Sequence, residues 1–185
     1  PAASGPNVMD IDFDALIANE TDSTLKDMHE YFRDRTPTEK NQYTGMFQGK
    51  NLLLFTGEAF WIGAVNEQYT PTLYKLAHSG FVFENFYNPL WYYSTVDGEY
   101  AATTGLIPTN QVNASQRYAG KNGVSMYFSM GNQLRALGYP TLAYHNNTAN
   151  YYDRNLSHPN LGYDFYACDT GLDVAMTWPQ SDLEM

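Results

Sequence analysis

The stretch VSMYFSMGNQLRALGYPTLAYHNN, residues 124–147, decides the fold because a helix pattern in it runs directly into a strand pattern. Its first part indicates a helix that ends at Gly138, and YPTLAYHNN, residues 139–147, indicates a strand. A change from helix to strand within so few residues is typical of α/β proteins.

The same alternation continues upstream of this stretch. TPTLYKLAHSG, residues 70–80, predicts a helix with Thr70 as its cap and Pro71 at its first position. FVFENFYN, residues 81–88, predicts a strand, and the uninterrupted apolar run NLLLF, residues 51–55, is typical of a strand buried on both faces. We therefore predict an α/β fold with a largely parallel sheet sandwiched by helices.

The N-terminal part of the chain differs in composition from the rest. The first residues, PAASGPN, have the composition of a linker, and the acidic segment that follows carries Leu25, Met28 and Phe32 at the spacing of one helical stripe. We expect residues 1–29 to form a linker and an N-terminal helical segment, and residues 30–185 to belong to one larger domain.

Composition and charge argue against nucleic-acid binding. With 43% hydrophobic residues, the 185-residue chain can bury a real core. Its 20 acidic and 10 basic residues give a formal charge of -10, and no cluster of Lys and Arg stands out, so we expect no nucleic-acid partner. An anionic substrate would then need a few placed cations or a bound metal ion.

Two further observations concern compartment and redox chemistry. Cys168 is the single cysteine, so the chain has no internal disulfide and no thiolate metal site. The apolar runs are far shorter than the roughly 20 residues that a membrane span requires, and no signal-peptide pattern opens the sequence. We expect a soluble chain.

Polar residues follow each predicted strand. Glu58 comes directly after the first strand, Thr95 after the second, and His145 and Arg154 after the third. Because ligands bind beyond the carboxyl ends of parallel strands, these side chains are expected at one edge of the sheet. A carboxylate, a hydroxyl and an arginine together suit metal-assisted phosphoryl or sulfuryl transfer.

Each of these residues also has a plainer interpretation. Glu58 alone is typical of a solvated loop acid, a lone His145 is more often structural than functional, and Arg154 beside Asp153 suits a surface ion pair. Ser-His-acid hydrolysis remains open on residue types, although the sequence lacks a nucleophile-elbow signature.

The segment WYYSTVDGEYAATTGL, residues 91–106, leaves two alternatives open. Ser94 and Asp97 have the spacing of a serine-to-acid capping box at the start of a helix. Alternatively, one hydroxyl lies at the helix N-terminus because it attacks a phosphorus centre. The spacing alone favours capping.

The order of motifs resembles a known family. KNLLLFTGEAF, YTPTLYKLAHSGFVFENFYNP, YSTVDGEYAATTGLIP and GYPTLAYHNN, followed by YYDRN and LGYDFY, are similar to the extracellular catalytic domain of the lipoteichoic acid synthase family. These enzymes are phosphoglycerol transferases within the alkaline phosphatase and sulfatase superfamily. The resemblance implies that residues 30–185 are the N-terminal part of a sulfatase-like catalytic domain, incomplete in this chain.

The resemblance also implies roles for individual residues. It makes Glu58 a metal ligand and Thr95 the metal-bound nucleophile, which leaves Ser94 to cap the helix. A Trp-x-Arg pair lines the glycerol-phosphate pocket of the family, and here it reads Tyr152 to Arg154, with a tyrosine in place of the tryptophan. Tyr152, Arg154 and His145 are thus the expected substrate-binding residues.

The activity implied by the resemblance is metal-dependent transfer of a phosphoglycerol-type headgroup through a covalent threonine intermediate. The implied donor is an anionic membrane phospholipid, the acceptor a glycolipid or teichoic-acid-like polymer, and the metal Mn²⁺ or Mg²⁺ in preference to Zn²⁺. The full-length protein would be anchored at the outer face of a bacterial cell membrane. An Asp-His metal pair and a further substrate-binding His lie further along in the family, so we expect these residues to be an inactive soluble fragment on their own.

Two alternatives compete with headgroup transfer. A sulfatase or phosphodiesterase of the same superfamily would use Glu58 and Thr95 but pass the group to water. A non-catalytic surface module would bind glycans or lipid headgroups with its tyrosines and Arg154.

Overall fold

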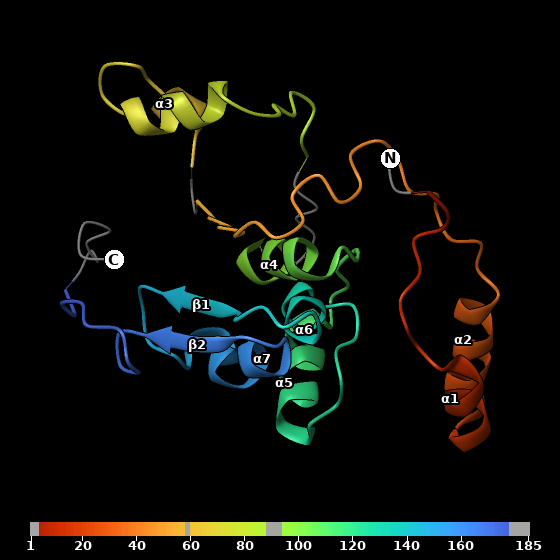
Figure 1. Cartoon of the computed structure of the whole chain (residues 1–185). Coiled ribbons are helices and arrows are strands. Elements are labelled where there is room, and N and C mark those ends of the chain that lie inside the picture. Colours follow the sequence, from red (N-terminus) through yellow and green to blue (C-terminus); the bar gives the residue numbers. More distant parts are fainter. Residues whose placement is uncertain (1–3, 58–59, 88–93, 178–185) are drawn as a thin grey trace. The chain divides into compact units, whose positions relative to one another are not determined.

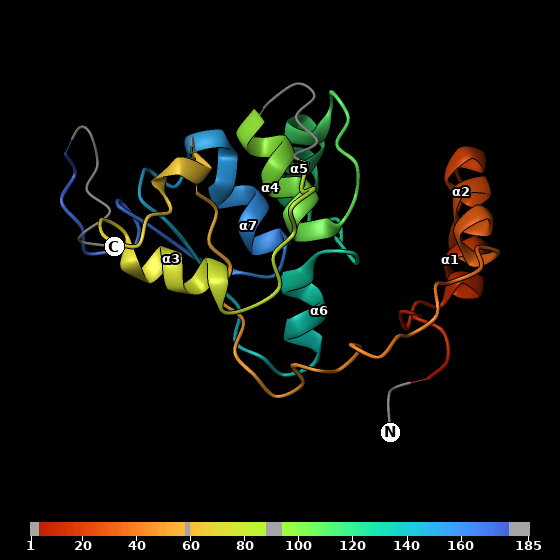
Figure 2. The same ribbon diagram turned by 90° about the horizontal axis from the view of Figure 1, so that it is seen from above.

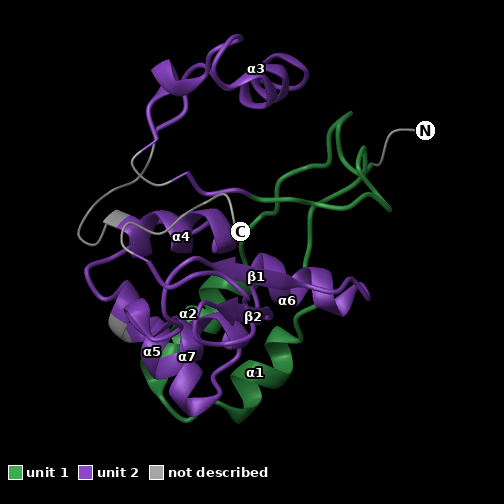
Figure 3. Cartoon of the chain, turned by 90° about the vertical axis from the view of Figure 1, so that its left-hand side faces the viewer, with its two compact units in different colours: residues 1–54 green, residues 55–185 purple. Residues whose placement is uncertain are grey.

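The computed structural model describes residues 4–57, 60–87 and 94–177 of the chain. It divides into two compact units, residues 1–54 and residues 55–185, which Figure 3 shows in different colours. The domain boundary predicted between residues 29 and 30 marks where the family resemblance begins, whereas the two units are defined by their compactness. The predicted boundary therefore stays a prediction.

The first unit is built on two helices that pack against each other, α1 (Phe13–Asn19) and α2 (Ser23–Arg33). Each helix begins after an aspartate whose side chain accepts hydrogen bonds from free backbone N–H groups. Asp12 accepts from the N–H of Ala15, and Asp22 accepts from the N–H groups of Thr24 and Leu25. The helix predicted from the apolar stripe is therefore present as α2.

The second unit holds the remaining helices and both strands. Its helical elements are η1 (Ile62–Ala64), α3 (Pro71–His78), α4 (Ser94–Thr104), α5 (Val112–Asn122), α6 (Met130–Ala136), η2 (Tyr151–Asp153) and α7 (Arg154–Asn160). One predicted start is confirmed, because Pro71 is the first residue of α3, although the Thr70 side chain makes no capping hydrogen bond. Helix α4 is described from Ser94 onward, and capping by Ser94 stays a prediction. The helix expected to end at Gly138 is shorter than expected, because the Ser129 side chain caps α6 by accepting from the N–H of Asn132.

The sheet consists, in the described residues, of the parallel pair β1 (Leu142–His145) and β2 (Asp164–Ala167). Figure 1 shows the two strands side by side, with α7 in the connection between them. This connection gives the strand–helix–strand unit that an α/β fold requires. His145 pairs with Ala167, so both residues lie at the carboxyl end of the sheet.

Two predicted strands are wrong for this structure. Residues 51–55 and 81–87 lie in no strand, and the side chains of the first run are exposed, Leu53 to 78% and Phe55 to 83%. A strand exists only where a neighbouring strand takes up its backbone hydrogen bonds, and no described segment pairs with either run. An apolar run shows that a segment can be buried, but it does not show which other strand it would pair with.

The packing of the second unit depends on a close approach of α5 to α7. Figure 2 shows α4, α5 and α7 gathered together, and α7 also contacts β2. A Cβ atom on Gly120 would lie 2.3 Å from the carbonyl oxygen of Leu156, so only glycine allows this helix spacing. Ser129 is fully buried, and its hydroxyl donates to the carbonyl of Leu161 at 2.9 Å.

Among the described residues, no helix combines the length and the apolar character that crossing a membrane demands.

Candidate functional site

Helix α4 carries Thr95 and Glu99 on one face. Residues four apart in an α-helix lie above one another, so the Thr95 hydroxyl at the helix N-terminus and the Glu99 carboxylate one turn later point to the same side. Val96 and Asp97, between them, are 2% and 0% exposed and anchor the helix in the fold. The predicted nucleophile is therefore held on a fixed element.

Arg154 is the first residue of α7, and the backbone before it is strained. Tyr152 and Asp153 have φ angles of 58° and 55°, in the left-handed region, which costs about 1–2 kcal/mol for each non-glycine residue. The chain turns sharply here, and the Arg154 side chain enters the protein, where it is only 5% exposed. Strain of this kind is concentrated at functional sites.

The surface ion pair between Arg154 and Asp153 does not form. Asp153 instead lies 3.5 Å from Nε of Arg117, and Arg154 turns away from it to Glu99. The plainer interpretation of Arg154 is therefore wrong.

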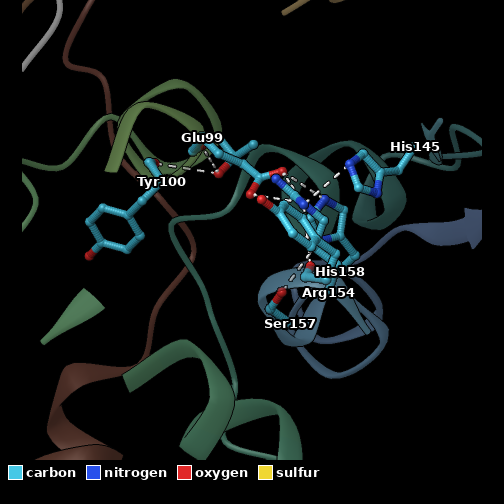
Figure 4. Close-up of polar contacts among 8 residues, drawn as sticks. Glu99, Tyr100, His145, Arg154, Ser157 and His158 are labelled. Atoms are coloured by element: carbon cyan, nitrogen blue, oxygen red, sulfur yellow. Dashed lines mark hydrogen bonds and ion pairs between the residues drawn. The ribbon is translucent and has the colours of Figure 1, made fainter. Parts of the chain in front are cut away.

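Glu99 joins two cationic or proton-donating groups of α7. Nε of Arg154 donates to Oε1 and Oε2 of Glu99 at 3.1 and 3.3 Å, and Nε2 of His158 lies 3.1 Å from Oε1. Figure 4 shows the carboxylate facing Arg154 and His158, while the Tyr100 ring points away from the group. Because a carboxylate only accepts, His158 carries a proton on Nε2 in this arrangement.

The guanidinium also reaches the carboxyl end of β1. Nη1 of Arg154 lies 3.3 Å from Nε2 of His145 and donates to the backbone carbonyl of Tyr151 at 3.3 Å. Its Cζ atom lies 5.4 Å from the centre of the Tyr152 ring, within the range of a cation–π contact. Arginine has no acceptor, so Nε2 of His145 is the unprotonated nitrogen in this contact.

The electrostatics of the group follow from these contacts. Burial by itself disfavours the Glu99 carboxylate, but the hydrogen bond and charge of His158 and the charge of Arg154 outweigh it and lower the pKa of Glu99. Burial and the nearby Arg154 charge lower the pKa of His145. The site therefore holds an ionised carboxylate and favours a neutral His145.

The structure brings together three of the predicted site residues. Arg154, His145 and Tyr152 are grouped by the contacts above, and Thr95 lies on the face of α4 that bears their partner Glu99. Glu58 lies outside the described residues, so its expected distance of about 3–5 Å from Thr95 stays a prediction.

The donor atoms of the described residues bear on metal binding. The described residues contain no group of three His, Cys, Asp or Glu side chains placed to hold a metal ion. Glu99 is already engaged with Arg154 and His158 and does not offer a free carboxylate. The role of Thr95 as a metal ligand stays a prediction.

Sequence reasoning missed Glu99 and His158. Both lie four residues after a predicted site residue, Glu99 after Thr95 and His158 after Arg154. This spacing places each of them on the same helix face as its neighbour, so helix periodicity was a usable signal.

Comparison with known proteins gives matches in sequence and in structure. The sulfatase family model matches residues 50–184. Lipoteichoic acid synthase 2 of Bacillus subtilis (strain 168) is 26% identical over 153 residues, which is 77% of this chain and 22% of the relative. The crystal structure of the lipoteichoic acid synthase LtaP from Listeria monocytogenes is 25% identical, covers 58% of this chain and 26% of that chain, and has a TM-score of 0.47. The chain thus spans about a fifth of the length of this relative. The family model and the sequence similarity confirm the predicted resemblance.

Proposed function

The chain belongs to the sulfatase family, and we propose that it serves the transfer of a phosphoglycerol-type headgroup from an anionic membrane phospholipid to a glycolipid or teichoic-acid-like acceptor. The observation that carries the proposal is the grouping of Arg154, His145 and Tyr152 beside the helix that bears Thr95. The similarity to a lipoteichoic acid synthase supports this reaction over others of the family.

Thr95 is the proposed nucleophile. Its oxygen forms a bond to phosphorus while the bond from phosphorus to the lipid glycerol oxygen breaks, and Thr95 loses a proton as the leaving diacylglycerol gains one. An acceptor hydroxyl then attacks the same phosphorus and returns a proton to Thr95 as the threonine ester breaks. The N-terminus of α4 favours negative charge at this position.

Arg154 is the proposed phosphate-binding residue. Its Nε and Nη1 are engaged by Glu99, His145 and the Tyr151 carbonyl, whereas no residue of the described part of the chain bonds Nη2. That nitrogen is available to a phosphoryl oxygen, and a guanidinium suits such an oxygen. The Tyr152 ring supplies an aromatic wall beside it.

Family membership implies a divalent metal ion, and we propose Mn²⁺ or Mg²⁺ rather than Zn²⁺, with Glu58 and Thr95 among its ligands. Oxygen ligands suit these ions. A bound divalent ion would lower the pKa of a coordinated hydroxyl. The site of action proposed is the outer face of a bacterial cell membrane, with the whole protein membrane-anchored and its catalytic domain extracellular.

The test is a headgroup-transfer assay on the whole protein. Vesicles containing phosphatidylglycerol are incubated with a glycolipid acceptor and Mn²⁺, and diacylglycerol release and phosphoglycerol-labelled acceptor are measured together. We expect both products, with loss of both in Arg154→Ala and retention in Arg117→Ala, whose side chain is 62% exposed. Release of neither product by the wild type would overturn the proposal.

The sulfatase family match favours hydrolysis as a second candidate. A sulfatase or phosphodiesterase would release its product at the same rate with and without acceptor. Acceptor-independent release of glycerol phosphate or of sulfate would therefore select this alternative.

A further inference from the structure

We propose that Glu99, itself held by His158, is a positioning residue that orients the Arg154 guanidinium toward an anionic ligand. The inference rests on the proposed function, in which Arg154 binds a phosphoryl oxygen. It gives roles to Glu99 on α4 and His158 on α7, neither of which was among the predicted site residues.

The geometry of the guanidinium carries the first step. The group is planar, so fixing two of its nitrogens fixes the direction of the third. Both carboxylate oxygens of Glu99 accept from Nε of Arg154, at 3.1 and 3.3 Å. The backbone carbonyl of Tyr151 accepts from Nη1 at 3.3 Å. The direction of Nη2 is then determined by Glu99 and the backbone together.

Glu99 is itself fixed. Nε2 of His158 lies 3.1 Å from Oε1, the same oxygen that Arg154 contacts at 3.1 Å. The His158 ring is held in turn by the Phe165 ring of β2, with 4.7 Å between the ring centres, and Nδ1 lies 3.3 Å from the Ser157 hydroxyl. The carboxylate is thus held from two sides, by Arg154 and by His158, and these contacts link α4 to α7.

A positioning role and a simple counter-charge role predict opposite effects of removing the charge. As a counter-charge, Glu99 would weaken the attraction of Arg154 for an anion, so Glu99→Gln would bind phosphate compounds more tightly. As a positioning residue, it aims the guanidinium, so Glu99→Gln, which keeps the shape, would bind them more weakly. Glu99→Ala would bind them more weakly still.

The experiment measures, by calorimetry, the affinity of the whole protein for glycerol phosphate. We expect affinity to fall by about tenfold to a hundredfold in Glu99→Ala, the range for one lost hydrogen bond to a charged group, and by less in Glu99→Gln. If Glu99→Ala does not fold, the affinity of Glu99→Gln alone decides the test. The matched control is Asp164→Ala, which removes an exposed carboxylate from its ion pair with Arg135 and leaves the affinity unchanged.

A double-mutant cycle separates positioning from general damage. If Glu99 acts through the guanidinium, Glu99→Gln has little further effect on affinity in an Arg154→Lys background, which has no Nε–H to hold. Equal losses in both backgrounds, or tighter binding by Glu99→Gln, would overturn the inference.

A second readout is independent of ligand and of activity. The Arg154 Nε–H signal in nuclear magnetic resonance is expected to be sharp and slow to exchange in the wild type and to broaden or disappear in Glu99→Gln. If the wild type binds no glycerol phosphate, the proposed function fails, and this signal alone decides the inference. A signal that persists unchanged in Glu99→Gln overturns it.

Discussion

Glu99 on α4 holds Arg154 on α7 across 55 positions of the sequence, with Nε of the guanidinium 3.1 Å from Oε1 of the carboxylate. The Arg154 side chain is 5% exposed and the Glu99 side chain 22%, so the pair is largely shielded from solvent. An ion pair in such surroundings is sensitive to the loss of one partner, because the other charge then stays poorly solvated. This relationship ties the stability of the fold to the residues of the candidate site.

Replacing Arg154 by Ala is therefore expected to destabilise the protein as well as impair the site. We expect the free energy of unfolding to fall by about 2–3 kcal/mol, a little below the range for breaking a fully buried pair, because His158 still contacts Glu99. Chemical denaturation monitored by circular dichroism measures this change.

The matched control is Arg117→Ala. Arg117 also forms an ion pair with a carboxylate, that of Asp153, but it is 62% exposed, and exposed pairs contribute less than about 1 kcal/mol. If the two variants lose equal stability, the Glu99–Arg154 pair is no more important than an exposed surface pair.

Acid is expected to destabilise the protein in two steps. The pKa of His145 is lowered from its ordinary value of 6.5, so the unfolded chain binds a proton first and stability falls as pH decreases from 6.5 through the folded pKa. The pKa of Glu99 is lowered from 4.5, so its contribution is present above pH 4.5 and is lost as pH falls through the folded value.

Urea unfolding across this pH range, repeated on two variants, assigns the steps. His145→Asn should remove the step that begins near pH 6.5, and Glu99→Gln should reduce the one below pH 4.5. A wild-type profile that is flat from pH 6.5 downward would show that neither group changes its proton affinity on folding.

Local sequence signals were sufficient for parts of this fold. The start of α3 follows from Pro71, whose fixed φ angle and missing N–H suit the first position of a helix. The strand at residues 142–145 was also expected. The runs at residues 51–55 and 81–87 were not assigned correctly, since strand formation depends on a distant partner that an apolar run does not specify.

The candidate site was predictable to the same extent. His145 was identified by its place at the end of a predicted strand and Arg154 by its place after that strand, and the structure puts their side-chain nitrogens 3.3 Å apart. Their link to Glu99 was not predicted, because it joins helices that lie 55 positions apart and depends on how α4 and α7 pack. The left-handed backbone at Tyr152 that turns Arg154 inward also leaves no mark in composition.

The contact of α5 with α7 gives a test of packing. Gly120→Ala is expected to destabilise the protein by about 1–3 kcal/mol, the usual cost of overpacking, because the new Cβ would meet the backbone carbonyl of Leu156 at 2.3 Å. A backbone atom cannot move aside as a flexible side chain can.

Gly80→Ala is the control for this substitution. No atom lies within 4 Å of a Cβ at Gly80, and its φ angle is not in the left-handed region. Thermal unfolding should therefore show a clear loss for Gly120→Ala alone, and a Gly120→Ala protein as stable as the wild type would mean that α5 and α7 are further apart than described.

Thr95 and Ser94, at the start of α4, both carry a hydroxyl, and Thr95 is the proposed nucleophile. In the whole protein, Thr95→Ala is expected to abolish headgroup transfer, because the attacking oxygen is removed. Thr95→Ser should keep partial activity, since it keeps a hydroxyl at the same position of α4. Ser94→Ala should largely spare turnover, because Ser94 is assigned to capping, at a cost of about 1 kcal/mol in stability. Mass spectrometry of protein quenched during turnover should find a phosphoglycerol group on the peptide containing Thr95 in the wild type and none in Thr95→Ala. Normal turnover by Thr95→Ala, or an adduct on Ser94, would reverse the assignment of the two hydroxyls.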